Sequence, residues 1–203
     1  MDELTTTSYA ILGQLALRPW TTYALTREMG RNFHFFWPRA ESAIYAEVKR
    51  LAARGLATAE REHVGQRQRT SYAITPAGQQ ALAAWLATPA KDFVLEGEVL
   101  LRVFFAGFGT QEQLLAALEQ ARVQAEALLR VGEAIGREAQ AGQAPFQEQV
   151  AVRAFVFDFL WSYGRTIQRW AERTQAEVAT WGERSPEERQ AQGVEIIARA
   201  MES

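Results

Sequence analysis

The spacing of apolar residues changes once within the first ninety positions, and this change constrains the fold more than any other feature. Apolar residues first recur at every third or fourth position, which predicts three helices, over about residues 6–17, 21–30 and 39–54. From Leu56 to Thr75 the pattern turns to alternation, which predicts a β-hairpin with its tip at residues 63–68. Pro76 directly follows Thr75, and an N-cap followed by proline predicts the start of a fourth helix.

Beyond Pro89 the pattern stays helical. Long helices are expected over about 110–135 and 146–181, followed by a last helix from Ser185. Helices of this length usually bury their apolar face against another helix, often from a second chain. We therefore expect a mainly α protein with a small β-hairpin wing. Its predicted parts are an N-terminal winged helix-turn-helix at residues 1–89 and a C-terminal helical dimerisation domain at residues 90–203.

Composition excludes several classes of site. The 203 residues include no cysteine and only two histidines, which argues against disulfides, thiolate metal sites and most histidine-dependent catalysis. We find no Gly-rich phosphate loop, nucleophile elbow or paired carboxylates, so no enzyme activity, cofactor or metal is expected. The sequence also lacks an apolar run long enough to span a membrane and a basic, apolar leader at Met1. We expect a cytoplasmic protein.

Charge is distributed unevenly along the chain. Up to Pro89 there are ten Lys and Arg against seven Asp and Glu, whereas the remainder carries twelve against seventeen. A mildly basic front and an acidic back indicate two modules with different partners.

The order of three helices and a basic hairpin predicts a DNA-binding surface. A helix fits the major groove, and a neighbouring hairpin can place basic side chains on phosphates or in the minor groove. Five residues of the third helix lie off its apolar face and are free to meet DNA: Arg39, Glu41, Ser42, Tyr45 and Lys49. Arg67 and Arg69 flank the hairpin tip, while Thr22 and Tyr23 lie at the start of the second helix, where backbone N–H groups can bind a phosphate.

The same residues carry a resemblance to a known family. Residues 7–25, 36–56 and 69–78 resemble the opening, the recognition helix and the wing of PadR-type transcriptional regulators. Residues 98–108 and the segment around 159–170 are similar to the helical C-terminal domain of that family. The resemblance implies a homodimer that binds double-stranded DNA at a pseudo-palindromic operator and usually represses.

Carried over by position, the resemblance assigns Ser42, Tyr45 and Lys49 to reading the bases and Tyr23 to the DNA backbone. It assigns Arg67 and Arg69 to the wing. Family wings often carry more basic residues at the tip than this one, in which glutamines alternate with the arginines.

Two questions stay open at this stage. Many PadR-type regulators sense a small aromatic effector, and Trp161 and Trp170 are candidate contacts, although aromatic residues at helical spacing more often form a core or an interface. The alternative function is a winged-helix protein–protein interaction module without operator binding, which the low isoelectric point of about 5.8 favours. The basic residues at the wing favour the regulator.

Overall fold

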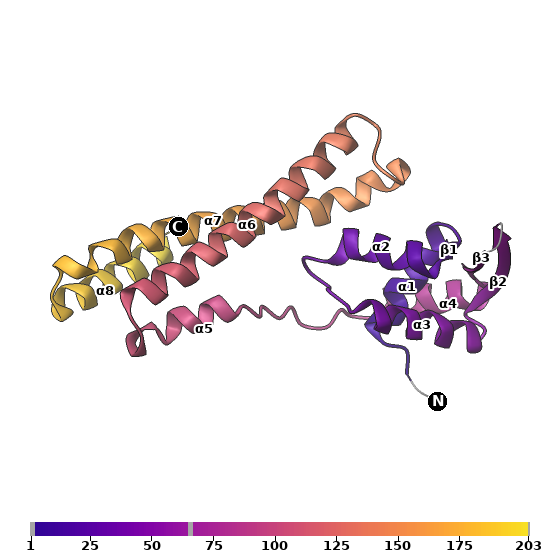
Figure 1. Ribbon diagram of the computed structural model, residues 1–203, viewed down its shortest axis with the longest axis horizontal. Coiled ribbons are helices and arrows are strands. Elements are labelled where there is room, and N and C mark those ends of the chain that lie inside the picture. Colours follow the sequence, from indigo (N-terminus) through magenta and orange to yellow (C-terminus); the bar gives the residue numbers. More distant parts are fainter. Residues whose placement is uncertain (1–2, 65–66, 203) are drawn as a thin grey trace. The chain divides into compact units, whose positions relative to one another are not determined.

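The computed structural model describes residues 3–64 and 67–202, which form two compact units. The N-terminal unit ends at Phe93, and the C-terminal unit begins at Val94. The N-terminal unit contains four helices and three strands (Figure 1): α1 (Thr6–Leu17), β1 (Trp20–Thr21), α2 (Thr22–Phe33), α3 (Glu41–Ala53), β2 (Ala57–Val64), β3 (Arg67–Ile74) and α4 (Pro76–Leu86).

Threonine side chains set the starts of three of these helices. Thr5 and Ser8 form a capping box at α1, and the hydroxyl of Thr21 accepts the Ala24 N–H at α2. The hydroxyl of Thr75 accepts the Gly78 N–H at α4, with proline at the first helical position as predicted. Gly55 follows α3 with a φ of +72°, a left-handed conformation that glycine adopts without strain.

The core of the N-terminal unit lies between α1, α2 and α3. Its fully buried apolar side chains are Ile11, Leu12, Leu15, Leu25, Val48 and Leu51. Trp20 is also buried, and its indole N–H donates a 2.8 Å hydrogen bond to the backbone carbonyl of Gln14. These contacts hold α3 at a fixed orientation relative to the rest of the unit.

The small sheet differs from the predicted hairpin by one strand. Its order is β1-β3-β2, and β1 pairs antiparallel with β3 through Trp20 opposite Tyr72. A two-residue strand is too short to show alternation, so sequence patterning could not reveal it. Strands β2 and β3 also continue past the predicted ends, up to the pairing of Val64 with Arg67. The outer parts of these strands are mostly polar, and backbone pairing there does not require alternating apolar residues. The sequence pattern therefore ended before the strands do.

The C-terminal unit is built on two long helices that lie side by side (Figure 1). Its elements are α5 (Glu98–Phe104), η1 (Ala106–Phe108), α6 (Gln111–Gln140), η2 (Gln147–Gln149), α7 (Val150–Ala179), η3 (Thr180–Glu183) and α8 (Pro186–Glu202). Small residues let α6 and α7 approach closely, since a Cβ at Gly164 would lie 3.1 Å from a methyl of Leu129. Among the described residues, no helix is long and apolar enough to cross a membrane.

Polar contacts tie the last helix to the long hairpin of helices. The side chain of Gln192, which is buried on α8, accepts a 3.0 Å hydrogen bond from the Trp181 indole and donates to Glu177. Arg199 reaches the same Glu177 carboxylate at 2.7 Å. Hydrogen bonds from Arg199 and Gln192, together with the charges of Arg199 and Arg184, lower the pKa of Glu177 below its ordinary value. The outward side of α8 keeps its apolar residues exposed, Ile197 and Met201 among them.

Candidate nucleic-acid interface

Helix α3 has one anchored face and one free face. Ile44, Val48 and Leu51 are buried against α1 and α2. Ser42 and Lys49 are exposed, and Tyr45, which lies between them at the same helical face, is half-buried. The spacing of three and four residues aligns these three side chains along the helix. The structure therefore brings together the three residues of α3 that the sequence nominated as base readers.

Arg39 lies just before α3 and is held by its surroundings. Its guanidinium stacks over the Trp37 ring at 4.0 Å, and its Nε donates to the Thr7 hydroxyl at 3.3 Å. It also donates a 2.7 Å hydrogen bond to the carbonyl of Pro38. Arg39 is thus an exposed cation at the N-terminal end of α3, in a position fixed by α1 and by the aromatic connector.

The start of α2 offers backbone donors. Thr21 is the N-cap and its hydroxyl already accepts the Ala24 N–H at 3.2 Å. The amides of Thr22 and Tyr23 belong to the first helical turn, where no intrahelical carbonyl is in reach. The Tyr23 ring is 65% exposed beside them. These amides are the groups that the sequence nominated for a phosphate contact, and a helix N-terminus favours an anion.

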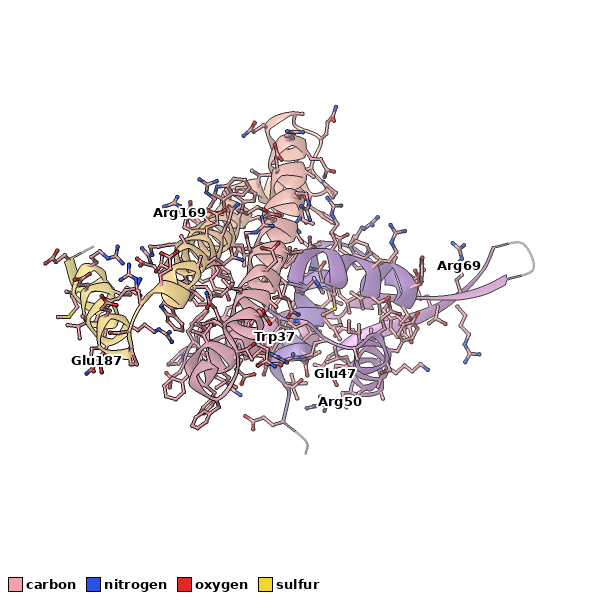
Figure 2. All side chains as sticks on the ribbon, turned by 60° about the vertical axis from the view of Figure 1, so that its left-hand side comes forward. Trp37, Glu47, Arg50, Arg69, Arg169 and Glu187 are labelled. Atoms are coloured by element: carbon pink, nitrogen blue, oxygen red, sulfur yellow. The ribbon has the colours of Figure 1, made fainter. Side chains whose placement is uncertain are left out.

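The wing is formed by β2 and β3. Arg69 lies opposite Glu62 in the ladder, and its exposed side chain points away from the sheet (Figure 2). Arg61 on β2 is also exposed. Arg67 begins β3, and its side chain lies outside the described part of the chain. The wing thus offers two described arginines to a partner, on neighbouring strands.

One polar network behind α3 was missed by sequence reasoning. Glu47 and Arg50 of α3 form an ion pair of 2.7 Å, and both contact the hydroxyl of Ser8 on α1, which is fully buried. The Glu47–Arg50 spacing is visible in the sequence, but nothing local connects it to a residue thirty-nine positions earlier. The network fixes the rotation of α3 on α1 and so determines which of its residues face outward.

The charge state of this network is stable near neutral pH. Burial raises the pKa of the Glu47 carboxyl, but hydrogen bonds from Arg50 and Ser8, with the charges of Arg50 and Arg54, outweigh it. The pKa therefore lies below its ordinary value, and Glu47 remains an anion paired with Arg50.

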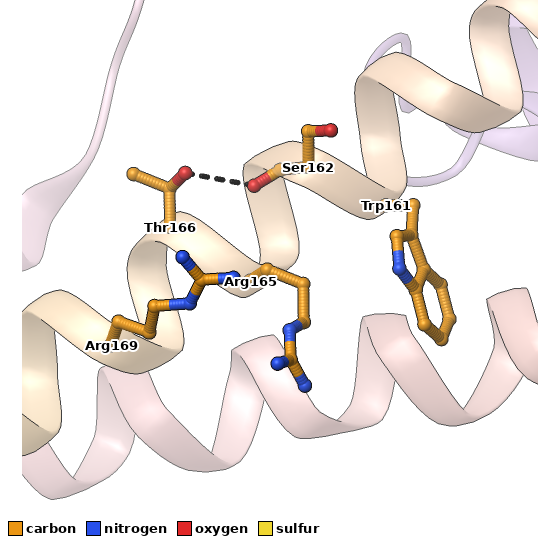
Figure 3. Close-up of a pocket in the computed structure, with 5 residues that line it drawn as sticks. All are labelled: Trp161, Ser162, Arg165, Thr166 and Arg169. Atoms are coloured by element: carbon orange, nitrogen blue, oxygen red, sulfur yellow. Dashed lines mark hydrogen bonds between the residues drawn. The ribbon is translucent and has the colours of Figure 1, made fainter.

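The two tryptophans nominated as effector contacts lie in different surroundings. Trp170 packs against the buried cluster of Leu114, Leu118 and Val178, so its surroundings are those of a core residue. Trp161 stacks on Phe157 and lines a surface hollow on α7 (Figure 3). The described residues contain no cluster of His, Asp or Glu side chains that could hold a metal ion.

Comparison with known proteins identifies this arrangement. Residues 11–84, which hold α1 to α3 and the wing, match the family model described as "Transcriptional regulator PadR-like family". This part of the chain is therefore similar to PadR-like regulators. The match covers the region in which the sequence placed the reading helix and the wing.

A curated relative and two solved structures extend the comparison. The negative transcriptional regulator PadR of Bacillus subtilis is 31% identical over 100 residues, which span 48% of this chain and about half (54%) of that protein. The crystal structure of Bacillus subtilis PadR in complex with operator DNA superposes with a TM-score of 0.74 at 21% identity, covering 86% of this chain and 99% of that one. The same protein in complex with p-coumaric acid gives 0.67 at 20%, with coverage of 86% and 99%.

The structural likeness confirms the predicted fold class over both units, beyond the segment that the family model matches. The helical C-terminal unit has the fold seen in the corresponding part of these structures. The relatives that match are transcription regulators, not enzymes.

Proposed function

We propose that this chain is a sequence-specific DNA-binding transcription regulator, a homodimeric repressor of the PadR type whose operator binding a small aromatic molecule relieves. The observation that carries the proposal is the free face of α3, where Ser42, Tyr45 and Lys49 are aligned on a helix whose other face is fixed in the core. A helix presented in this way fits the major groove and can read base edges there.

The other nominated residues support this helix by contacting phosphates. Arg39 lies at its N-terminal end, Thr22 and Tyr23 at the start of α2, and Arg69 on the wing. Phosphate contacts give affinity that falls as salt rises, while base contacts give sequence preference. The proposal thus assigns sequence preference to α3 and salt dependence chiefly to the wing and α2.

The C-terminal unit supports the assignment of a homodimer. It exposes several large apolar side chains, Phe104, Phe108 and Phe155 among them, and a second copy would cover such a surface. A two-fold dimer places two reading helices about 34–36 Å apart, one turn of DNA, which is why the operator is expected to be pseudo-palindromic.

Repression and the effector are supported by the named relatives. The Bacillus subtilis protein is a negative regulator, and its structures hold operator DNA in one case and p-coumaric acid in another. We further propose that the chain is no enzyme and acts in the cytoplasm, where its DNA target lies.

The first experiment is a binding titration of the full-length protein with DNA from immediately upstream of its own gene. A shuffled sequence of the same length serves as control, and both are measured at two salt concentrations. We expect preferential binding that weakens as salt rises. Equal and weak binding to both DNAs would contradict operator recognition at this site and favour the protein–protein interaction module.

Variants separate base reading from phosphate contact. Lys49→Ala is expected to cost about 1–3 kcal/mol and to relax the preference at one base pair. Arg69→Ala is expected to weaken binding to all sequences and to reduce the slope of log affinity against log salt by about 1. Arg137→Gln, an exposed change on α6, is the control and should alter neither quantity. Unchanged affinity and preference in Lys49→Ala would remove this residue from the reading set.

A further inference from the structure

Glu41 is the first residue of α3, and its side chain is exposed. It precedes Tyr45 by four residues, and Tyr45 precedes Lys49 by four, so the three side chains form one row along the helix. Helices that read DNA contact base edges mainly with the residues of their N-terminal part. Glu41 therefore lies at the end of the free face of α3 that enters the groove first under the proposed function.

The negative charge of Glu41 is out of place on a surface that binds DNA in general. DNA carries one negative charge per about 1.7 Å of helix axis, so an anion beside it opposes binding to every sequence. The other residues nominated on and before α3 are neutral or cationic: Arg39, Ser42, Tyr45 and Lys49. A carboxylate at this point lowers general affinity, and only a contact that particular base pairs supply offsets that loss.

The protein does not neutralise the Glu41 carboxylate. In the part of the chain that the structure describes, no arginine or lysine lies within ion-pair distance of it. Arg39 is two residues away, but its guanidinium stacks over Trp37 at 4.0 Å and donates to the Thr7 hydroxyl and the Pro38 carbonyl. Both carboxylate oxygens of Glu41 therefore remain available to a partner.

The backbone of Glu41 is held by the rest of α3. Ile44, one turn further along, is buried in the core, and the pair of Glu47 and Arg50 contacts Ser8 on α1. These contacts fix the rotation of the helix, so the direction in which Glu41 leaves α3 is set before DNA arrives. A carboxylate presented from a fixed helix end is suited to one particular base pair.

A carboxylate distinguishes the four bases by their edges in the major groove. An ionised carboxylate only accepts hydrogen bonds, and cytosine presents only a donor there, its N4 amino group. Guanine presents two acceptors and thymine one, so both repel the carboxylate. Adenine presents an acceptor beside its amino donor. Cytosine is therefore the base that fits an unpaired glutamate at this position.

We propose that Glu41 determines base specificity by accepting a hydrogen bond from the N4 amino group of one cytosine in each half of the operator. The contact favours cytosine, and repulsion from guanine and thymine acts against the competing sequences. The inference rests on the proposed function and names one base that the operator contains. Two-fold symmetry of the dimer repeats this base in the other half-site.

Selection from a library of double-stranded DNA with a randomised central segment tests the proposal. The full-length wild type, Glu41→Gln and Glu41→Ala are each used to enrich bound sequences. We expect the wild type to enrich a symmetric motif with one cytosine per half-site that depends on Glu41. Glu41→Gln should replace this cytosine by adenine, because an amide pairs with the N6 and N7 atoms of adenine. Glu41→Ala should show no preference there, with the other positions unchanged.

Titrations with the selected site then measure the change. The wild type should prefer cytosine over adenine at this position by about fivefold or more, and Glu41→Gln should lose or reverse that preference. Glu41→Gln should also bind shuffled DNA more tightly than the wild type, because an anion has been removed from the phosphate-facing surface. Weaker binding to one sequence and tighter binding to another cannot result from a loss of folding.

A matched control separates base reading from helix stabilisation. A carboxylate in the first turn stabilises any helix through the macrodipole, and Ala40 supplies no side-chain cap at α3. Glu112 is the corresponding exposed carboxylate in the first turn of α6. Glu112→Gln should leave the enriched motif and both affinities unchanged. Circular dichroism verifies the fold of each variant.

The outcomes distinguish this inference from the proposed function. If the wild type enriches a motif that Glu41→Gln and Glu41→Ala enrich unchanged, the regulator stands and the role of Glu41 is wrong. Uniformly weaker binding with unchanged base preference would assign Glu41 to helix stability and would also overturn the inference. If the wild type enriches no motif at all, the proposed function is contradicted and this inference with it.

Discussion

The two units of this chain differ in how far they bury their large apolar side chains. In the N-terminal unit the central apolar side chains of α1, α2 and α3 are fully buried, as Leu12, Leu25 and Leu51 are, although Leu86 on α4 is 69% exposed. In the C-terminal unit several are more than three-quarters exposed: Phe104, Phe108, Phe155 and Met201. Apolar residues recur at helical spacing in both units, so the pattern tells which face of a helix is apolar but not what covers that face. The N-terminal unit is complete in one copy, whereas the C-terminal unit presents a surface that one copy leaves open.

Truncating one apolar side chain in each unit tests this difference in burial most directly. Leu51→Ala removes a fully buried side chain between α3 and the core and is expected to destabilise the N-terminal unit by about 2–5 kcal/mol. Phe108→Ala removes a side chain that is 94% exposed and should change unfolding within one protomer by less than about 0.5 kcal/mol.

Urea unfolding with amide hydrogen exchange assigns each loss to its unit, and sedimentation velocity reports the oligomeric state. If a second copy covers Phe108, its replacement weakens association instead of folding. A large loss of protomer stability in Phe108→Ala, at a concentration where the protein is monomeric, would contradict the open surface.

A glycine pair tests how tightly the N-terminal unit is packed. A Cβ at Gly78 would overlap the Leu56 carbonyl oxygen and lie 2.8 Å from a side-chain carbon of Ile74, so Gly78→Ala should cost about 1–3 kcal/mol or more. Gly30 on α2 has nothing within 4 Å of its would-be Cβ, and Gly30→Ala should be neutral or stabilise by up to about 1 kcal/mol. Thermal unfolding of both variants measures the difference in their stability. Similar melting temperatures would show that α4 can move away from Leu56 at little cost.

These cases indicate what the sequence could and could not predict. The bounds of α1 and the start of α4 follow from capping residues and periodicity, which are local, so they were predictable. Strand β1, the contact of Ser8 with Glu47 and the packing of Trp170 against Leu114 depend on residues far apart in the chain. For the candidate site, the free face of α3 was predictable from spacing, whereas the contacts of Ser8 with Glu47 and Arg50 that hold α3 on α1 were not.

The half-buried ion pair of the N-terminal unit gives an intermediate, pH-dependent effect. Because the folded-state pKa of Glu47 lies below its ordinary value near 4.5, the carboxylate stabilises the fold above that pH. Stability falls as the pH drops through the lower, folded-state pKa. Glu47→Gln should therefore cost about 1 kcal/mol at pH 7, since the group is partly exposed, and little once Glu47 is protonated.

Urea unfolding of the wild type and Glu47→Gln from pH 3 to pH 7 measures this difference. A difference that stays constant over the whole range would show that the Glu47 charge does not contribute. The Ser8→Ala variant should also lose stability at pH 7 and lose less of it at low pH, because it removes one of the hydrogen bonds that lower the Glu47 pKa.

The smallest effect is expected for an exposed ion pair of the C-terminal unit. Arg102 and Glu98 pair at 2.6 Å across one turn of α5, but their side chains are 61% and 74% exposed, so water and salt screen the attraction. Arg102→Gln should cost about 0.5 kcal/mol or less, and the cost should vanish in high salt. The same substitution at Arg50, which is anchored to Ser8 and to Glu47, should cost more and keep most of its effect in salt. If the two arginine variants lose the same free energy of unfolding with the same salt dependence, the Ser8–Glu47–Arg50 network contributes no more than an exposed ion pair. Other contacts of α3 would then have to fix its orientation.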